Sequence, residues 1–410
     1  MSSTLEARDA SVTTDAHDAS VTFESLGVSS DIIARLAADG IDAPFAIQTL
    51  TIADGLAGRD VTGKAKTGSG KTLAFGIPLI ERVSSARPHH PTGLVLVPTR
   101  ELANQVGEVL APLAKVRDRS VQTVYGGVGF EPQREALQRG VDILVATPGR
   151  LIDLMEQGDV RFDAIEVLVL DEADRMLDMG FSPQVQKILF KITQPHQTML
   201  FSATLDGAIK RIVDRYLVDP VEHEVVSDEP TVDQMEHRFL YVHQMDKVKV
   251  CAAICRSTDR ALVFCNTKRA ADRVAQQLER EGVKAGAIHG DLRQAARERA
   301  LADFASGKVP VLVATDVAAR GLHIDDVGIV IHYDPTDDPK DYLHRSGRTA
   351  RAGRQGLAVT LMLWNQENEV RVVLRRLAID QPIVEMFSND PRLADLAAWK
   401  PVEAAESATV

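Results

Sequence analysis

Short, unbroken runs of apolar residues recur along this chain, and they constrain its fold more than any other feature. In the first half the runs span residues 94–97, 143–146, 167–170 and 199–201. Each is followed by polar or glycine-containing residues, and longer amphipathic segments lie between them. Because short apolar runs are typical of strands buried on both faces, the pattern predicts a parallel sheet covered by helices.

The same alternation returns in the second half, with runs at residues 262–265, 286–289, 311–314 and 329–331. The predicted fold class is α/β, with two tandem domains, each a mostly parallel sheet covered by helices on both faces. The N-terminal segment contains few apolar side chains, so we expect it to be disordered. The expected divisions are this segment at 1–22, domain 1 at 23–222, a linker at 223–233, domain 2 at 234–388 and a short flexible tail at 389–410.

Composition narrows the classes of function. The chain has 410 residues, of which 45% are hydrophobic and 5% aromatic, and its formal net charge is −11. This charge argues against a basic coat for general adhesion to nucleic acids, so any polyanion site must be local. The apolar runs are too short for a membrane span, and no secretory signal is visible, so we expect a cytoplasmic protein. Cys251, Cys255 and Cys265 lack a zinc-site spacing and are expected to be buried apolar residues.

A glycine-containing loop between a predicted strand and a predicted helix is the first candidate site. Its backbone N–H groups can surround phosphate oxygens at the positive end of the helix. Lys71 is expected to reach the β and γ phosphates of ATP, and the Thr72 hydroxyl to ligate Mg²⁺. The strict pattern has glycine at position 65, and an ordinary turn is the alternative interpretation. The candidate ATP-binding residues of the loop are Ala65, Thr67, Gly68, Ser69, Gly70, Lys71 and Thr72.

An acidic pair, Asp171 and Glu172, directly follows the segment 165–170, which ends in the apolar run at residues 167–170. Ligands of open α/β sheets bind at this edge, where parallel strands end. We expect Asp171 to hold Mg²⁺ through water, and Glu172 to orient and deprotonate the water that attacks the γ phosphate. A solvated acidic turn is the alternative, but a phosphate loop and a paired acidic strand end together are far rarer than either alone.

Residues 171–174 read Asp-Glu-Ala-Asp, and this motif stands in an ordered series that resembles the DEAD-box ATP-dependent RNA helicases of superfamily 2. The resemblance implies two tandem RecA-like domains. It also implies an enzyme that hydrolyses ATP on binding RNA and locally unwinds short duplexes or remodels RNA–protein complexes. The other motifs occupy residues 98–102, 126–127, 147–150, 202–204, 263–267, 294–297, 314–321 and 344–351.

The resemblance assigns further nucleotide contacts. Gln48 matches the family glutamine that reads adenine, and its amide has one donor and one acceptor to offer. Phe23 matches an aromatic residue that packs near the base, with a core phenylalanine as the alternative. Arg348 and Arg351 match arginine fingers that reach the γ phosphate, although a solvated basic face is an alternative. His323 stands where the family has an aspartate associated with the ribose, and it either contacts a ribose hydroxyl or faces solvent.

A second group of motifs implies an RNA track. Glycine permits close approach of the backbone, while threonine and arginine donate to phosphates and 2′-hydroxyls, so binding is expected to be independent of sequence. Each motif taken alone suits an ordinary loop or helix cap. The candidate RNA-binding residues are Pro98, Thr99, Arg100, Gly126, Gly127, Thr147, Pro148, Gly149, Arg150, Gln294, Arg297, Thr315 and Gly321.

Further residues match positions that couple the nucleotide and RNA sites in the family. Short hydroxyls near an aspartate and a histidine can relay domain closure, whereas local backbone bonds at a strand end are the alternative. These candidates are Asp174, Ser202, Thr204, Asp316, Arg320, His344 and Arg345.

Departures from the family pattern lie around the predicted base site. Ile41 occupies a place where many relatives carry an aromatic residue, and Phe45 and Ala46 replace the usual Thr-Pro. We therefore expect hydrolysis to be better specified than adenine selectivity. The function predicted is an RNA-dependent ATPase and RNA helicase, acting as a monomer with ATP, Mg²⁺ and RNA. Two rivals are an ATP-gated RNA clamp with little turnover and a DNA translocase of the same superfamily.

Overall fold

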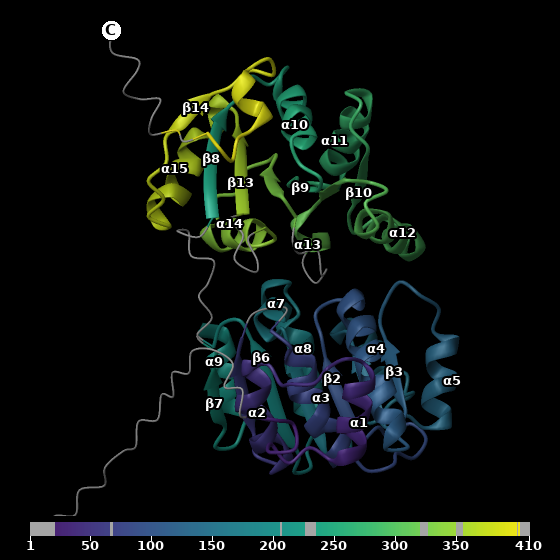
Figure 1. The fold of residues 1–410 in the computed structure, drawn as a ribbon. Coiled ribbons are helices and arrows are strands. Elements are labelled where there is room, and N and C mark those ends of the chain that lie inside the picture. The colour runs from purple at the N-terminus through teal and green to yellow at the C-terminus, as the bar shows by residue number, and fades with distance from the viewer. Residues whose placement is uncertain are drawn as a thin grey trace, which may run out of the picture. The chain divides into compact units, whose positions relative to one another are not determined.

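The computed structural model describes residues 21–65, 69–205, 207–225, 235–319, 327–349, 356–399 and 401. The chain divides into two compact units, Met1–Ser227 and Asp228–Val410. Each unit contains one parallel sheet with helices on both faces (Figure 1). The predicted fold class is confirmed.

The first unit is built on a seven-stranded sheet in the order β3-β4-β2-β5-β6-β1-β7. All of its strand pairs are parallel, so the carboxyl ends of the strands meet at one edge. The strands are β1 (Val61–Lys64), β2 (Gly93–Leu96), β3 (Val121–Val124), β4 (Ile143–Ala146), β5 (Val167–Asp171), β6 (Gln197–Ser202) and β7 (Val221–Glu224).

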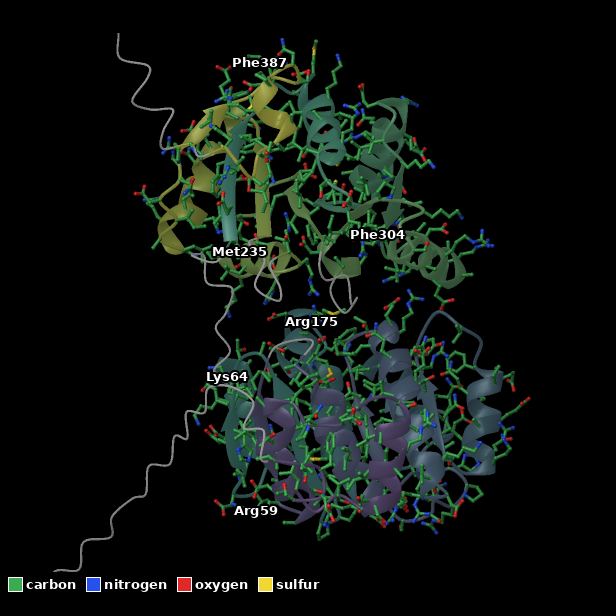
Figure 2. The ribbon with its side chains drawn as sticks, in the orientation of Figure 1. Arg59, Lys64, Arg175, Met235, Phe304 and Phe387 are labelled. Atoms are coloured by element: carbon green, nitrogen blue, oxygen red, sulfur yellow. The ribbon has the colours of Figure 1, made fainter. Side chains whose placement is uncertain are left out.

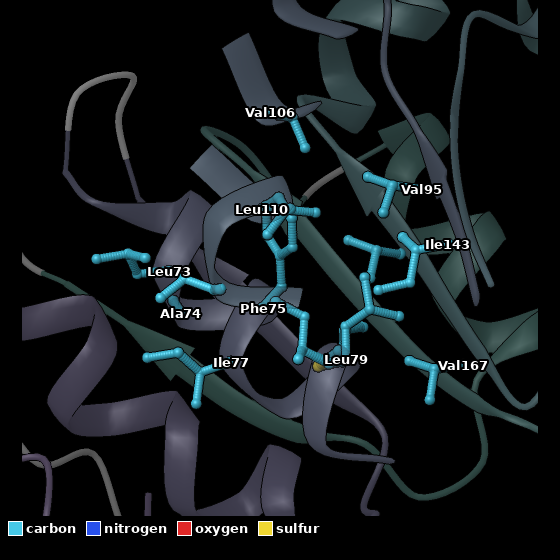
Figure 3. Close-up of a cluster of buried hydrophobic side chains, with 14 of the residues drawn as sticks. Leu73, Ala74, Phe75, Ile77, Leu79, Val95, Val106, Leu110, Ile143 and Val167 are labelled. Atoms are coloured by element: carbon cyan, nitrogen blue, oxygen red, sulfur yellow. The ribbon is translucent and has the colours of Figure 1, made fainter. Parts of the chain in front are cut away.

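Alternate side chains of the central strands enter two separate cores, which explains why the apolar runs are unbroken. Val95 and Val97 face one core, and Leu94 and Leu96 face the other. Figure 3 shows the first core, where α3 packs against α4 and the sheet. The helices of this unit are α1 (Ser30–Ala38), α2 (Ala46–Leu56), α3 (Lys71–Arg82), α4 (Arg100–Val116), α5 (Glu131–Arg139), α6 (Pro148–Glu156), α7 (Ala173–Asp178), α8 (Ser182–Lys191) and α9 (Gly207–Tyr216).

The second unit repeats the plan with a parallel sheet in the order β10-β11-β9-β12-β13-β8-β14. Its strands are β8 (Met235–Tyr241), β9 (Ala261–Phe264), β10 (Ala285–Ile288), β11 (Val311–Ala314), β12 (Ile329–His332), β13 (Gly356–Met362) and β14 (Ile383–Glu385). Its helices are α10 (Lys247–Arg256), α11 (Lys268–Arg280), α12 (Gln294–Ala305), α13 (Asp316–Ala319), α14 (Pro339–Ser346) and α15 (Glu367–Arg376), with 3₁₀ turns η2 (Trp364–Gln366) and η3 (Pro391–Ala394).

The expected flexible tail at 389–410 is wrong for its described part. Leu393 and Leu396 are buried in the second core, and Trp399 packs against it. Nε of Arg238 donates to the carbonyl oxygen of Leu396 at 3.1 Å. Few apolar residues are enough to order this segment, because the hydrogen bond from Arg238 and the turn η3 also hold it in place. At the other boundary, β7 runs two residues beyond the expected end of domain 1 at 222.

The remaining structural expectations concern burial. Cys251, Cys255 and Cys265 are free and buried, as predicted. In the part of the chain that the structure describes, no helix has the length and apolar character that crossing a bilayer requires. The N-terminal segment expected to be disordered lies outside the described residues up to residue 20.

Candidate functional site

The carboxyl edge of the first sheet carries the candidate phosphate site. Figure 2 shows Arg59, which precedes β1, at one end of this unit, and Lys64 and Arg175 toward the other end. Gly70 caps the N-terminus of α3 with a φ of 86°, a conformation that favours glycine. Nζ of the buried Lys71 donates to the carbonyl oxygen of Ala65 at 2.9 Å. The first N–H groups of an α-helix have no partner within the helix, so the start of α3 favours a bound anion.

The acidic pair lies at the end of β5 on the same edge. The side chains of Asp171 and Glu172 are buried, with 2% and 4% of each residue exposed. Glu172 has a φ of 50°, and its N–H donates to Oδ1 of Asp171 at 2.9 Å. The carboxylate of Glu172 pairs with Arg175, one turn along α7. Sequence reasoning missed this partner, although its i, i+3 spacing on a helix is a usable signal.

Negative charge accumulates around Asp171. Its burial raises the pKa of the carboxyl group to about 6; Lys71 opposes this rise, whereas Glu172 and Asp174 add to it. Among the described residues no group of three His, Cys, Asp or Glu side chains could hold a metal ion. Mg²⁺, however, is commonly bound through one or two carboxylates together with substrate phosphates. The surplus negative charge and the oxygen donors of this edge fit such an ion.

The two residues predicted to contact the base have different environments. Gln48 is only 1% exposed, and its Nε2 donates to the carbonyl oxygen of Gly70 at 2.9 Å. Its Oε1 accepts from the N–H of Phe45 at 2.9 Å. Gln48 therefore lies beside the phosphate loop with both ends of its amide bonded. Phe23 lies in the first core, and its contact with the base stays a prediction.

Asp174 and Ser202 connect α7 to the end of β6. Oγ of Ser202 accepts from the N–H groups of Asp174 at 3.3 Å and Thr204 at 3.4 Å. Oδ2 of Asp174 in turn accepts from the N–H of Ala203 at 3.2 Å. The structure thus brings together three predicted coupling residues through bonds that hold one carboxylate against the turn after β6.

The predicted RNA residues of the first unit gather where β2, β3 and β4 end. Thr99 caps α4 by accepting from the N–H of Leu102 at 3.2 Å. Arg100 packs against Gly127, because a Cβ built on that glycine would lie 2.5 Å from Nη1. Gly127 has a φ of 86°, whereas a Cβ on Gly126 would meet open space.

The 147–150 motif joins this group through Arg150. Its Nη2 donates to the carbonyl oxygen of Val128 at 2.9 Å, and its guanidinium lies 3.9 Å from the ring centroid of Phe130. Nε and Nη1 of the same buried guanidinium have no hydrogen-bond partner within the described ranges. Burial therefore lowers the pKa of Arg150, with Asp153 opposing. Thr147 donates its N–H to the carbonyl oxygen of Val124, while Pro148 and Gly149 form the first turn of α6.

In the second unit Arg345 is the centre of a buried network. Its Nε and Nη2 donate to the two carboxylate oxygens of Asp316, each at 2.6 Å. Nη1 donates to the carbonyl oxygen of Asp334 at 2.7 Å, and Nη2 also donates to Oδ1 of Asn266 at 3.0 Å. The network connects three predicted motifs. Asp334 was not predicted, and Asn266 was recognised only as part of its motif.

A stack of aromatic rings includes Tyr342 of α14, the helix that also carries His344 and Arg345. The rings of His332 and Tyr342 lie 4.6 Å apart and are nearly parallel. Nε2 of His332 bonds with Oγ of Ser346 at 3.0 Å, and burial holds the pKa of this histidine well below its usual value. Sequence reasoning missed this support, because a lone histidine and tyrosine carry no motif.

Other predicted residues of the second unit surround the ends of its strands. Arg348 is buried directly after α14, and its N–H donates to the carbonyl oxygen of Arg345 at 3.3 Å. Thr315 donates its N–H to the carbonyl oxygen of Ile288 at 3.3 Å, and Arg297 is buried on α12. Gln294 begins that helix, and its side chain lies outside what is described. Also outside the described residues are Thr67, Gly68, Arg320, Gly321, His323 and Arg351.

Comparison with known proteins supplies the family. Residues 45–212 match the DEAD/DEAH box helicase family, and residues 246–353 match the helicase conserved C-terminal domain. The chain is 41% identical over 354 residues to the DEAD-box ATP-dependent RNA helicase CshA of Bacillus licheniformis, and equally to that of Bacillus subtilis. Both alignments cover 86% of this chain and 72% of the relative.

Comparison with a solved structure leads to the same family. S. cerevisiae Dbp5 bound to RNA and ADP BeF3 is 29% identical, with a TM-score of 0.76 over 90% of this chain and 96% of that one. These matches favour RNA helicase function over the passive clamp and the DNA translocase. The chain belongs to the DEAD-box ATP-dependent RNA helicases, a family that hydrolyses ATP.

Proposed function

We propose that the carboxyl edge of the first sheet binds ATP together with Mg²⁺ and activates water for attack on the γ phosphate. The observation that carries this proposal is the buried pair Asp171 and Glu172 close to Lys71, where the pKa of Asp171 is raised to about 6. Such an edge attracts a cation and a phosphate together. Lys71 holds the β and γ phosphates, Thr72 and Asp171 hold the ion, and Glu172 accepts the proton of the attacking water.

The ion supplies charge neutralisation on the phosphate oxygens when it is bound. The remaining work belongs to the side chains of the chain itself. Glu172 is held in place by Arg175 and by the left-handed backbone that turns it out of β5. A base fixed in this way is positioned before the substrate arrives, which lowers the cost of orienting it.

RNA is proposed to bind through its phosphates and sugars along the Thr, Arg and Gly motifs at the strand ends of both units. The support in the first unit is Arg150, whose buried guanidinium has two nitrogens, Nε and Nη1, without a hydrogen-bond partner among the described residues. Donors of this kind suit phosphate oxygens or 2′-hydroxyls and read no base, so binding is expected to be independent of RNA sequence.

ATP and RNA together are proposed to bring the two units into a closed state. In that state Arg348 and Arg351 stabilise charge on the γ phosphate, and Asp174, Ser202 and Thr204 transmit closure between the two sites. Duplex strain accompanies closure, and hydrolysis reopens the units. We also propose that the protein acts in the cytoplasm as a monomer.

Stimulated ATP turnover tests this function. The full chain is assayed with Mg²⁺ and saturating ATP, either alone or with single-stranded RNA or DNA of equal length. RNA is expected to raise turnover at least tenfold, DNA to have little effect, and Lys71→Ala to weaken ATP binding in all three conditions. Equal stimulation by DNA, or binding of RNA and ATP without turnover, would contradict the proposal.

A further inference from the structure

Phe45 is an exposed aromatic side chain beside the proposed nucleotide site. The residue is 52% exposed at the N-cap of α2, in a unit whose other large apolar residues are mostly buried. The nearby Ile41 is partly buried and packs against the first core instead. An exposed phenylalanine ring is common on protein surfaces when it stands alone. Its position against a phosphate loop sets this one apart.

The ring of Phe45 touches the start of α3. A Cβ built on Gly70 would lie 2.6 Å from Cδ2 of Phe45 and 2.5 Å from Nε2 of Gln48, so both side chains press on the same glycine. Gln48 also bonds to the N–H of Phe45 and to the carbonyl oxygen of Gly70, each at 2.9 Å. The ring, the amide and the phosphate loop therefore form one connected group.

A nucleoside triphosphate has one flat apolar face, which is its base. When its phosphates lie at the N-terminus of α3, a ring that flanks Gly70 is within reach of the nucleoside part of the same ligand. Stacking a base on an exposed aromatic ring removes apolar area of both from water. Neither the phosphates nor the charged side chains near Asp171 can bury apolar area against a phenyl ring.

We propose that Phe45 is a base-binding residue of the ATP site, where its ring stacks on the nucleobase while Gln48 presents a polar edge. This proposal rests on the proposed function, because it requires that ATP binds at this loop. Every base has a π face, so stacking itself favours no single base. Phe45 therefore adds affinity for nucleosides over bare phosphates, and discrimination among bases is left to the amide.

Equilibrium binding measured by calorimetry on the full chain separates the base from the phosphates. The ligands are ATP, GTP, inorganic triphosphate and a fluorescent probe, the triphosphate of 2-aminopurine riboside, whose fluorescence falls when its base stacks. Phe45→Ala is expected to weaken ATP and GTP about tenfold each, to leave inorganic triphosphate within twofold, and to abolish quenching of the probe. Phe45→Tyr is expected to retain affinity and quenching.

Phe190→Ala is the matched control, because this phenylalanine is 69% exposed on α8 of the same unit. It is expected to leave all four ligands unchanged. Unchanged ATP affinity in Phe45→Ala, or equal losses for ATP and inorganic triphosphate, would overturn the role of the ring. Lys71→Ala reports the proposed function separately: it should weaken ATP and inorganic triphosphate alike, and unchanged binding of both there would contradict the phosphate site itself.

Discussion

The carboxyl edges of the two sheets differ in how far their buried charges are balanced by opposite charges. In the first unit, three acidic groups crowd one edge, and the pKa of Asp171 rises to about 6 although Lys71 lies near. In the second unit, the buried Arg345 is bound by both oxygens of Asp316 and by two further acceptors. With Lys71 and Arg175, the partner of Glu172, both counted, the first edge still has more acidic than basic groups, whereas Arg345 of the second edge is balanced by Asp316.

The difference in charge balance bears on whether each edge gains stability from a bound ligand. An unbalanced acidic site lowers its free energy by taking up a cation and the phosphates that accompany it. A neutralised network gains nothing from a ligand, but it fixes α14 and thereby the residues that follow it, including Arg348. Under the proposed function, the first edge is the place of ATP hydrolysis, and the network of the second edge holds Arg348 in position.

The largest expected effect concerns the chemistry of the first edge. Glu172→Gln keeps the shape of the side chain but removes the proposed base, so RNA-stimulated ATP turnover should fall by ~10²- to 10⁴-fold. ATP affinity should change little, since Lys71 and the phosphate loop are untouched. Steady-state hydrolysis and equilibrium ATP binding measure the two. Glu131→Gln on the exposed face of α5 is the control, and near-normal turnover in Glu172→Gln would remove the catalytic assignment.

The second edge should respond through stability. Arg345→Ala removes the cation that pairs with Asp316 and that donates to the carbonyl oxygen of Asp334 and to Oδ1 of Asn266. Because the Asp316 carboxylate is then left without its partner, the free energy of unfolding should fall by about 3 kcal/mol. Urea unfolding followed by circular dichroism measures this loss. Arg376→Ala, an exposed arginine on α15, should stay within ~0.5 kcal/mol of the parent. A loss equally small in Arg345→Ala would show that the network does not hold the second edge.

The sheets were more predictable than the site. Central strands such as β2 and β9 produce unbroken apolar runs because helices cover both of their faces. The edge strand β7 has alternating burial, so no apolar run marked it. Two of the buried residues that fix the C-terminal segment, Leu393 and Leu396, are too few to form a run.

Within the site, motifs revealed which residues carry charge but not how the charges are balanced. Candidate ligand-binding residues such as Lys71 and Asp171 follow from local patterns of strand, turn and helix. The partners of Arg345 do not, because Asn266 lies 79 positions away and meets it only in the folded sheet. Likewise, the exposure of Phe45 depends on how α2 packs beside α3, which no local pattern encodes.

The pH dependence of stability tests the unbalanced charge of the first edge. Because the pKa of Asp171 is about 6 when folded and 3.8 when unperturbed, the folded protein retains a proton that the unfolded chain releases between about pH 4 and 6. Stability from this group therefore falls as pH rises through that window. Asp171→Asn should raise the free energy of unfolding at pH 7 by at most ~3 kcal/mol, and the gain should vanish near pH 4.

Denaturant titrations at pH 4, 5, 6 and 7 measure this difference. Asp178→Asn, at the exposed end of α7, provides a control that removes one negative charge from the same helix without touching a buried site. A pH-independent gain in Asp171→Asn would mean that the buried carboxyl group carries no unbalanced charge, and the contrast between the two edges would fail.

The smallest expected effect lies in the hydrogen bonds around Ser202. Its Oγ accepts from the N–H groups of Asp174 and Thr204 at 3.3 and 3.4 Å, which are long bonds between neutral partners. Ser202→Ala should therefore lower the free energy of unfolding by only ~0.5 to 1.5 kcal/mol, well below the loss in Arg345→Ala. Ser202→Thr, which keeps the hydroxyl, is the matched variant. If Ser202→Ala instead lowers the free energy of unfolding as much as Arg345→Ala in the same urea titration, the hydrogen bonds of the first edge stabilise the fold as strongly as those of the second. The proposed contrast between the two edges would then fail.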